Sequence, residues 1–120
     1  MRMAKLREFL LSWDAGAWGE PSLDGSGVSV LRSTNFRELG SLSFENQALL
    51  SIDEKTLSKK RLCNGDLLLE RSGGGPLQPV GRVAGFWRSD EDDRFICGNF
   101  ISRLVPNRET VDPLYLMYVL

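Results

Sequence analysis

The sequence contains no histidine among its 120 residues. Histidine is the commonest general acid or base in enzymes, the commonest metal ligand and the side chain that titrates near neutral pH. Without it, serine and cysteine side chains lack the base that usually activates them as nucleophiles. The chain also has no Gly-x-Ser-x-Gly motif, so the sequence predicts a protein that is not itself an enzyme.

Cysteine is scarce as well, with Cys63 and Cys97 as the only two. They are too far apart in sequence for a paired metal motif and too few for a disulfide framework, which predicts free thiols in a reducing compartment. The apolar stretch 9–11 is too short for a signal peptide, and no apolar run approaches the roughly 18 residues of a membrane-spanning helix. We therefore expect a cytoplasmic protein that makes no membrane contact.

The chain has only five prolines, no low-complexity tract and no internal repeat, while 42% of its residues are apolar. A chain of this size can bury about two thirds of its unfolded surface, which supplies one modest core without metals or disulfides. The sequence therefore predicts a single domain over residues 1–120. The apolar helix pattern at its C-terminal end suggests the start of a longer helix, and so a fragment of a larger protein.

The net charge of −1 conceals an uneven distribution of charge along the chain. Residues 55–88 carry a net charge of +5, the rest of the chain carries −6, and an acidic run at 90–93 follows the positive stretch directly. Eleven of the 15 cations are arginine, whose planar fork pairs with phosphate oxygens or with the acceptor edge of guanine. The pattern fits an anionic partner, but it also fits structural ion pairs and a solvated charged surface.

Local patterns predict short helices and strands separated by glycine-bearing loops. Helices are expected where polar caps precede periodic apolar residues, over 6–13, over 54–61 after Asp53, and from Pro113 to the end of the chain after Asp112. Strands are expected at 28–34, 42–44, 49–52, 66–70, 80–87 and 95–105. The predicted class is α+β, with a mixed but largely antiparallel twisted sheet. Its parts are an N-terminal helix and loop (1–27), a β-rich core (28–105) and the start of a C-terminal helix (112–120), which the resemblance described below implies is a spacer helix.

Two stretches have the composition of ligand loops without the required pattern. The glycine-rich segment 72–76 follows a strand, but the chain has no Gly-Lys-Ser/Thr and no Gly-x-Gly-x-x-Gly, which argues against nucleotide binding. Its glycines fit either a hairpin loop or close approach to a large partner. The acidic run 90–93 lacks the spaced ligands of a calcium loop and reads as solvated. The sequence therefore predicts no metal and no cofactor in this chain.

Tryptophan and asparagine supply further candidates. Trp13 and Trp87 lie in periodic segments and are expected in the core, whereas Trp18 lies in a loop and could either fix that loop or meet a partner. Asn35 and Asn99 lie near strand ends. An asparagine amide can read adenine through two hydrogen bonds, but asparagine is also a common turn residue.

Taken as ordered blocks, the sequence resembles a target recognition domain of the specificity subunit of type I restriction-modification systems. The blocks together span nearly the whole chain. They are Trp18-Gly19-Glu20-Pro21, Val30-Leu31-Arg32-Ser33-Thr34-Asn35-Phe36 with Gly40, Arg61-Leu62, Gly65-Asp66-Leu67-Leu68-Leu69-Glu70-Arg71-Ser72-Gly73-Gly74, Pro79-Val80-Gly81-Arg82-Val83, Asn99-Phe100 with Arg103-Leu104 and Pro106, and Pro113 with Tyr115-Leu116.

This resemblance implies a non-catalytic module that reads one half of a split site on double-stranded DNA. A separate methyltransferase subunit, using S-adenosylmethionine, would methylate adenine, and a restriction subunit can join the assembly. A full specificity subunit has two such domains joined by helical spacers, so the C-terminal helix is also a candidate homodimer contact. Reading base edges in the major groove would fall to residues in loops and at strand ends. These are Trp18, Glu20, Arg32, Ser33, Thr34, Asn35, Arg71, Ser72, Gly73, Gly74, Arg82 and Asn99.

Two other interpretations stay open. The chain could be a specificity fragment that binds other subunits but no longer binds DNA, or a recognition domain of a fused restriction-methylation enzyme. Salt separates the first from DNA reading, because phosphate contacts weaken steeply with salt whereas an apolar protein interface does not require this. If Arg71 meets a base edge, Arg71→Ala should weaken duplex binding by about 1 to 3 kcal/mol.

Overall fold

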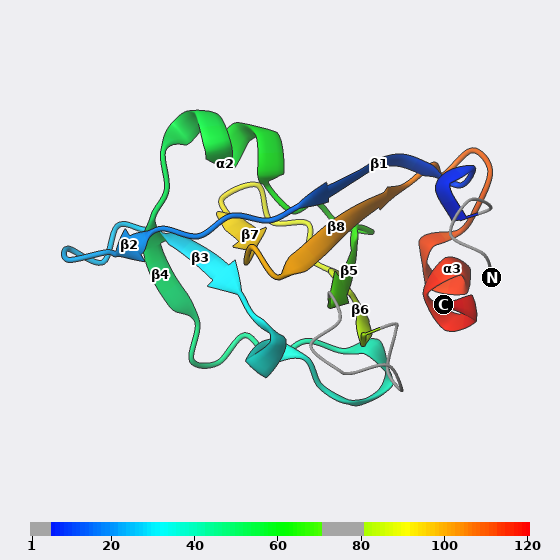
Figure 1. Cartoon of the computed structure of the whole chain (residues 1–120), viewed down its shortest axis with the longest axis horizontal. Helices are drawn as coiled ribbons and strands as arrows, with labels where there is room; N and C mark the ends of the chain where they lie inside the picture. The colour runs from blue at the N-terminus through cyan, green and yellow to red at the C-terminus, as the bar shows by residue number, and fades with distance from the viewer. Residues whose placement is uncertain (1–5, 71–80) are drawn as a thin grey trace.

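The computed structural model describes residues 6–70 and 81–120, which form two four-stranded sheets (Figure 1). The first sheet has the order β1-β8-β5-β6 and is antiparallel throughout. Its strands are β1 (Leu10–Ala15), β8 (Ile101–Pro106), β5 (Leu67–Glu70) and β6 (Val83–Gly85). The longest pairing joins β1 to β8, so this sheet ties the beginning of the chain to its end.

The second sheet has the order β2-β4-β3-β7 and contains one parallel pair, β3 with β7. Its strands are β2 (Glu20–Pro21), β4 (Ala48–Ser51), β3 (Val28–Leu31) and β7 (Phe95–Cys97). Two short 3₁₀ turns, η1 (Ser33–Asn35) and η2 (Glu38–Gly40), follow β3. Because β3 and β7 are parallel, the C-terminal ends of these two strands lie side by side. The candidate site described below forms at these strand ends.

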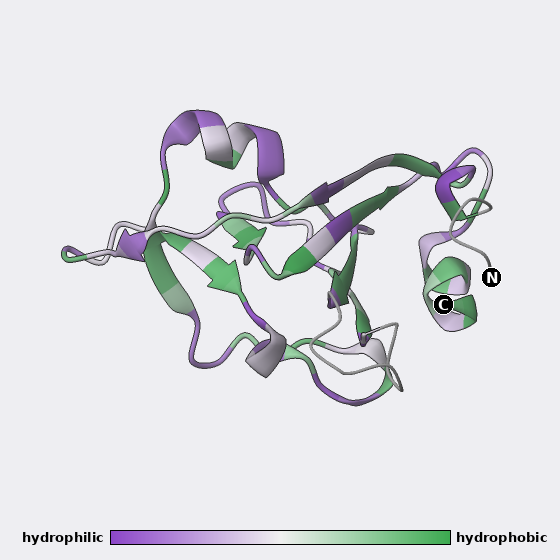
Figure 2. Ribbon diagram, in the orientation of Figure 1, coloured by the Kyte–Doolittle hydropathy of each residue, from purple (hydrophilic) through white to green (hydrophobic). Residues whose placement is uncertain are grey.

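The main hydrophobic core lies between the sheets, since it draws buried side chains from both. Leu31 and Phe95 come from the second sheet, and Leu68 and Ile101 from the first. Side chains alternate along a strand. Leu67 and Leu69 therefore point the opposite way from Leu68 and pack in a second cluster on the outer face of the first sheet. The continuous apolar run in β5 is thus explained by burial on both faces (Figure 2).

One helix covers the outer face of each sheet. Helix α2 (Glu54–Lys60) begins at the N-cap Asp53, whose carboxylate accepts from the Thr56 backbone N–H, and its Leu57 packs on β3 and β7. Helix α3 (Pro113–Val119) begins at the N-cap Asp112 and packs Leu116 and Met117 on β5 and β8. Each cap satisfies N–H groups that a helix leaves unpaired. Neither helix, among the residues described, is long and apolar enough to cross a membrane.

The α+β class predicted from the sequence is confirmed, as are both capped helices and the strands β3, β4 and β5. The expected single sheet is instead two sheets. Three expected strands also need correction. The stretch 42–44 forms only an isolated bridge between Phe36 and Leu42, the described part of 80–87 is strand only at Val83–Gly85, and 95–105 is broken into β7 and β8 around Gly98.

The predicted helix over 6–13 is wrong. Beyond a helical turn at Leu6 and Arg7, this segment becomes strand β1, so β structure begins well before residue 28. A register shift between Leu10 and Ser12 inserts one extra residue opposite β8. Such a bulge lets Leu10 and Trp13 pack against the same cluster, although residues three apart normally face opposite sides of a strand. The apolar residues in this segment are spaced as in a helix, but the bulge allows the same spacing to face one side of a strand.

The two tryptophans predicted to lie in the core differ in how far they are buried. Trp13 is partly buried against the α3 cluster, as predicted in outline. Trp87 is exposed, so the prediction that it lies in the core is wrong. Its indole lies over Gly85, where a Cβ would collide with the ring. Phe86, the residue before it, fills the core position instead.

Candidate nucleic-acid interface

The candidate site forms where the parallel strands β3 and β7 end side by side. The backbone N–H of Gly98 donates to the carbonyl oxygen of Leu31 at 2.9 Å, which joins the two strand ends. Residues 32–34 continue from β3 and residues 98–100 continue from β7. Two segments far apart in sequence therefore meet at one edge of the second sheet.

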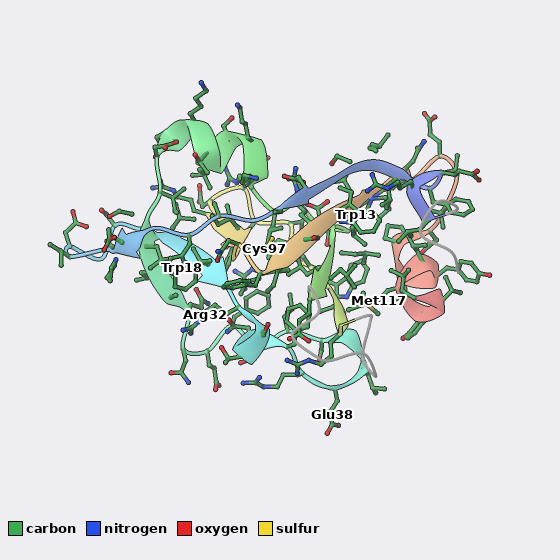
Figure 3. All side chains as sticks on the ribbon, in the orientation of Figure 1. Trp13, Trp18, Arg32, Glu38, Cys97 and Met117 are labelled. Atoms are coloured by element: carbon green, nitrogen blue, oxygen red, sulfur yellow. The ribbon has the colours of Figure 1, made fainter. Side chains whose placement is uncertain are left out.

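The connection after β1 brings a third segment to this edge. Gly16 donates its N–H to the Ile101 carbonyl at 2.9 Å, and Ala17 donates to the Cys97 carbonyl at 3.0 Å. A Cβ on Gly16 would collide with the Cys97 carbonyl oxygen, so only glycine permits this approach. Trp18 follows Ala17, and its six-membered ring lies over Gly98. A Cβ added to Gly98 would sit 3.6 Å from the Cε3 atom of that ring. Figure 3 shows Trp18 near Arg32 at the end of β3.

These three segments enclose an open pocket of about 370 Å³. Five of the residues predicted from the sequence line it, and three further residues complete it. The predicted ones are Trp18, Arg32, Ser33, Thr34 and Asn99, and the others are Gly98, Phe100 and Ile101. Trp18 is 50% exposed and Phe100 is 73% exposed, so two aromatic rings are available to a partner.

Arg32 is the one charged residue of this lining, and its side chain is held in place. Its terminal nitrogen donates to the Asn46 carbonyl oxygen at 2.6 Å. The Nε atom is buried and has no acceptor within the described part of the chain. With no carboxylate in the lining, the positive charge of Arg32 sets the electrostatic character of the pocket.

Asn35 does not line the pocket, and its predicted contact with DNA bases is not supported by its position. The residue is only 2% exposed. Its amide oxygen accepts from the Arg32 backbone N–H at 2.8 Å, and its amide nitrogen donates to the carbonyls of Ser43 and Glu45. Both ends of the amide are thus used to fix the chain after β3. Asn35 is a turn residue that positions Arg32, which was the alternative reading of the sequence.

Arg82 lies next to the site, where it forms an ion pair with Glu70. It contacts the carboxylate of Glu70 at 2.9 Å and donates to the Ser33 carbonyl at 3.0 Å. Hydrogen bonds from Arg82 and from the Ser33 side chain lower the pKa of Glu70 to about 2. Arg82 thus links β6 to η1 and is partly occupied by the fold, although its side chain remains more than half exposed.

The other predicted residues fall in different places. Glu20 is exposed in β2, where it pairs with Ser51 in β4, and it does not line the pocket. Arg71, Ser72, Gly73 and Gly74 lie outside the described residues. Glu70, the last described residue before them, is the carboxylate that contacts Arg82 beside the pocket.

Sequence reasoning missed Phe100 as a site residue, although it belongs to one of the matching blocks. The missed signal is Gly98, which was placed inside one continuous strand. The chain instead turns there, with the Ile101 N–H donating to the Gly98 carbonyl at 3.0 Å, and the turn exposes Phe100. A glycine within an otherwise apolar strand pattern is a common mark of such a break.

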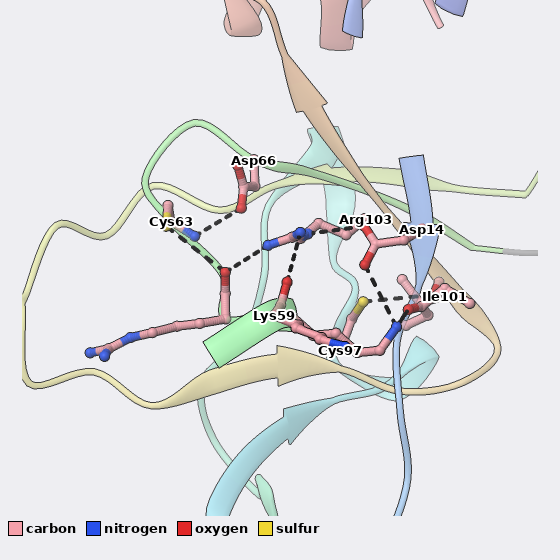
Figure 4. A network of polar contacts seen from close by, with 10 residues as sticks. Asp14, Lys59, Cys63, Asp66, Cys97, Ile101 and Arg103 are labelled. Carbon is pink, nitrogen blue, oxygen red and sulfur yellow. Dashed lines mark hydrogen bonds and ion pairs between the residues drawn. The ribbon is translucent and has the colours of Figure 1, made fainter. Parts of the chain in front are cut away.

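Several arginines of the positive stretch and beyond it serve the fold. Arg103 on β8 pairs with Asp14 on β1 at 3.2 Å and donates to the carbonyls of Lys59 and Arg61, so that it ties two strands of the first sheet to the end of α2 (Figure 4). Arg88 pairs with Asp93 at 2.7 Å. Part of the arginine excess is therefore structural, which was one of the two readings of the composition.

The acidic run 90–93 is likewise engaged with the fold, since Asp93 pairs with Arg88. Across residues 6–70 and 81–120, no three His, Cys, Asp or Glu side chains come together as metal ligands. No family model matches this chain, and no curated protein matches it. Function is therefore inferred from the residues around the pocket and from the blocks of sequence described above.

Proposed function

We propose that the chain is a DNA-binding module, one target recognition domain of a type I restriction-modification specificity subunit. It would read one half of a bipartite site. The observation that carries the proposal is the convergence of Trp18, Arg32, Ser33, Thr34 and Asn99 around one pocket. They come from three separate segments of the chain. Each of them is predicted as a site residue from the sequence alone.

The side-chain chemistry at this edge suits a DNA groove. Arg32 places a positive charge at the pocket, suited to a phosphate or to the acceptor edge of guanine, while hydroxyl and amide groups contact either bases or phosphates. Arg37, two residues after η1, and Arg82, just before β6, donate to the η1 carbonyls of Thr34 and Ser33. The charge of Arg37 adds to the positive potential near Arg32, whereas that of Arg82 is largely offset by Glu70. Positive potential draws phosphates toward a surface.

The partners follow from the resemblance and belong to the same proposal. The chain would carry no catalytic residues and hold no cofactor of its own. A methyltransferase subunit would bind S-adenosylmethionine and methylate adenine, and a restriction subunit can join the complex. Such an assembly works on DNA in the cytoplasm.

The test is binding of the purified chain to a pool of randomised duplexes, followed by fluorescence anisotropy at low and moderate salt. We expect affinity to fall steeply with salt, because log Kobs for duplex DNA decreases in proportion to the number of phosphates neutralised. Sequencing the retained duplexes would give the half-site. The proposal fails if the chain retains no duplex at low salt, both alone and with a methyltransferase subunit added.

Arg32 gives the matched mutational test. Arg32→Ala should weaken binding to the selected duplex by about 1 to 3 kcal/mol if the side chain meets a base edge. Arg32→Lys keeps the charge but loses the planar fork, so it should also weaken a base contact yet largely preserve a phosphate contact. The control is Arg94→Ala, because Arg94 precedes β7 at the opposite end of that strand and pairs with Glu54. Equal losses for the Arg32 and Arg94 variants would remove Arg32 from the interface.

A second candidate function, a protein-interaction module without DNA binding, is favoured by one observation at α3. Leu114, Tyr115, Tyr118 and Val119 are exposed on this helix. Runs of exposed apolar side chains mark protein interfaces more often than DNA interfaces. A chain that binds a methyltransferase subunit equally well at low and high salt, and binds no duplex, would fit this candidate and not the first.

A further inference from the structure

The pocket at the ends of β3 and β7 is shaped differently from a surface that only follows a groove. Groove readers touch the edges of bases, whose flat faces are covered by their stacked neighbours. Here two large rings, Trp18 and Phe100, border a hollow of about 370 Å³. That volume lies in the range of about 300 to 1,000 Å³ found for pockets that enclose small molecules. The pocket thus offers exposed aromatic surface to a flat ligand.

The polar groups of the pocket match the edge of a heterocycle. Ser33 and Thr34 have hydroxyls and Asn99 has an amide, and these groups both donate and accept hydrogen bonds. Nucleobase edges also carry donors and acceptors side by side. Arg32 supplies a charged donor, with no carboxylate in the lining to repel a phosphate next to the base. An apolar protein side chain would use the rings but would leave the charge of Arg32 without a matching group.

We propose that this pocket holds one unstacked nucleobase of the bound DNA, lying against the rings of Trp18 and Phe100. The inference rests on the proposed DNA binding and narrows it, because only a base outside the stack can present its face to an aromatic ring. The ligand is therefore a base from a bulge, a single strand or a locally opened duplex. Stacking tolerates any base, so this contact adds affinity with little sequence preference.

The other hollows in the described residues are less suited to a base. The space beside α3 is bordered by Arg82 and Tyr118 as well, but the rest of its lining is glycine and apolar side chains such as Leu6. Its described lining has one aromatic ring and no amide, serine or threonine. The hollow at the start of α2 includes the carboxylates of Asp53 and Glu54, which disfavour a phosphodiester. The pocket at the β3 and β7 ends places two exposed aromatic rings, a cation and hydroxyl and amide groups around one hollow.

The experiment compares three oligonucleotides of one sequence bound to the full chain: a matched duplex, a duplex with a single-base bulge, and the single strand. The bulged base is 2-aminopurine, whose fluorescence reports stacking. We expect the bulged duplex to bind about tenfold more tightly than the matched one, a difference of about 1.4 kcal/mol. We also expect the fluorescence of the bulged base to change when the chain binds.

Phe100→Ala is the decisive variant, because Phe100 is exposed and its removal leaves the core intact. It should abolish the tenfold preference and the 2-aminopurine signal, whereas Phe100→Trp should retain both. Tyr115→Ala is the matched control, since Tyr115 is an exposed aromatic on α3, outside the pocket. Circular dichroism melts of each variant separate a lost contact from a lost fold.

The outcomes keep the two proposals apart. Salt-dependent binding of the matched duplex with no preference for the bulge overturns the base pocket and leaves the proposed DNA binding standing. A preference for the bulge that survives Phe100→Ala also overturns the base pocket, because the base would then bind elsewhere. Absence of binding to all three oligonucleotides, with or without a methyltransferase subunit, overturns both proposals.

Discussion

Exposed aromatic side chains occur both at the pocket at the ends of β3 and β7 and on the outer side of α3. Figure 3 shows Trp18 and Arg32 toward one end of the longest axis and Met117 of α3 toward the other. At the pocket, Trp18 and Phe100 are surrounded by a cation, hydroxyls and an amide, brought together from three segments. On α3, the exposed residues belong to one short helix, and none of its seven residues is charged.

The contrast shows that exposure of aromatic side chains does not by itself define a partner. The two regions differ in the side chains that surround the aromatic rings. A polar, positively charged surround suits a nucleic acid, because backbone charge and base edges both require donors. An uncharged helical face suits a protein, because aromatic and aliphatic side chains are enriched in the core of protein interfaces and charged residues are depleted there. The following predictions test whether the two regions act separately.

The largest expected effect comes from the core between the sheets. Leu68 is fully buried in β5, in the same cluster as Leu31 and Ile101 on either side of the pocket edge. Leu68→Ala should lower the free energy of unfolding by about 2 to 5 kcal/mol, since it removes a packed side chain and leaves a cavity. Urea denaturation followed by circular dichroism measures the change. The control Leu114→Ala, at an exposed position of α3, should change it by about 0.5 kcal/mol or less.

Much of this core could be predicted from the sequence, because the signals there are local. The continuous run in β5 and the caps Asp53 and Asp112 are read from neighbouring residues, and each element forms where expected. Trp18, Arg32 and Asn99 were likewise recognisable as residues at loops and strand ends. Their convergence around one pocket was not predicted, because it depends on the parallel pairing of β3 with β7.

The failures share one physical cause, which is that contacts between distant segments override local pattern. The apolar spacing of Leu10 and Trp13 follows helical periodicity, yet pairing with β8 and a bulge make the segment a strand. Asn35 has an amide side chain of the kind that can pair with adenine. In the structure, however, its amide nitrogen is buried and donates to the carbonyls of Ser43 and Glu45. Neither the bulge nor these carbonyl partners are visible from residues close in sequence.

A smaller effect is expected at the ion pair that borders the pocket. The pKa of Glu70 is lowered from 4.5 to about 2, chiefly by hydrogen bonding from Arg82. A carboxyl whose pKa is depressed in the folded state stabilises the fold above its unfolded pKa, and this stability is lost as pH falls from about 4.5 toward 2. We expect a contribution of about 1 kcal/mol at neutral pH, because the exposed Arg82 partner is screened by solvent.

Glu70→Gln tests this contribution by urea denaturation at several pH values. The variant should be less stable than the parent at pH 7, and the difference should shrink below pH 4.5 and be lost as pH falls to about 2. Glu54→Gln is the matched control, since Glu54 pairs with Arg94 in an exposed bridge of small energetic value. A difference that stays constant across the whole pH range would show that the carboxylate charge of Glu70 does not stabilise this edge.

The smallest expected effect on DNA binding is at α3, and it is the most direct test of the separation between the two regions. Tyr115 and Tyr118 are exposed, and the buried residues of the helix are Leu116 and Met117. Tyr115→Ser with Tyr118→Ser should therefore leave the fold intact and change duplex affinity by less than about twofold, or about 0.4 kcal/mol. If α3 contacts the methyltransferase subunit, the same variant should weaken that association, measured by analytical ultracentrifugation of the mixed subunits. Phe100→Ala should show the reverse pattern, with weaker binding to the bulged duplex and unchanged subunit association. A tyrosine variant that loses duplex binding while retaining its circular dichroism melt would place DNA on α3 as well, and the two regions would then form one interface.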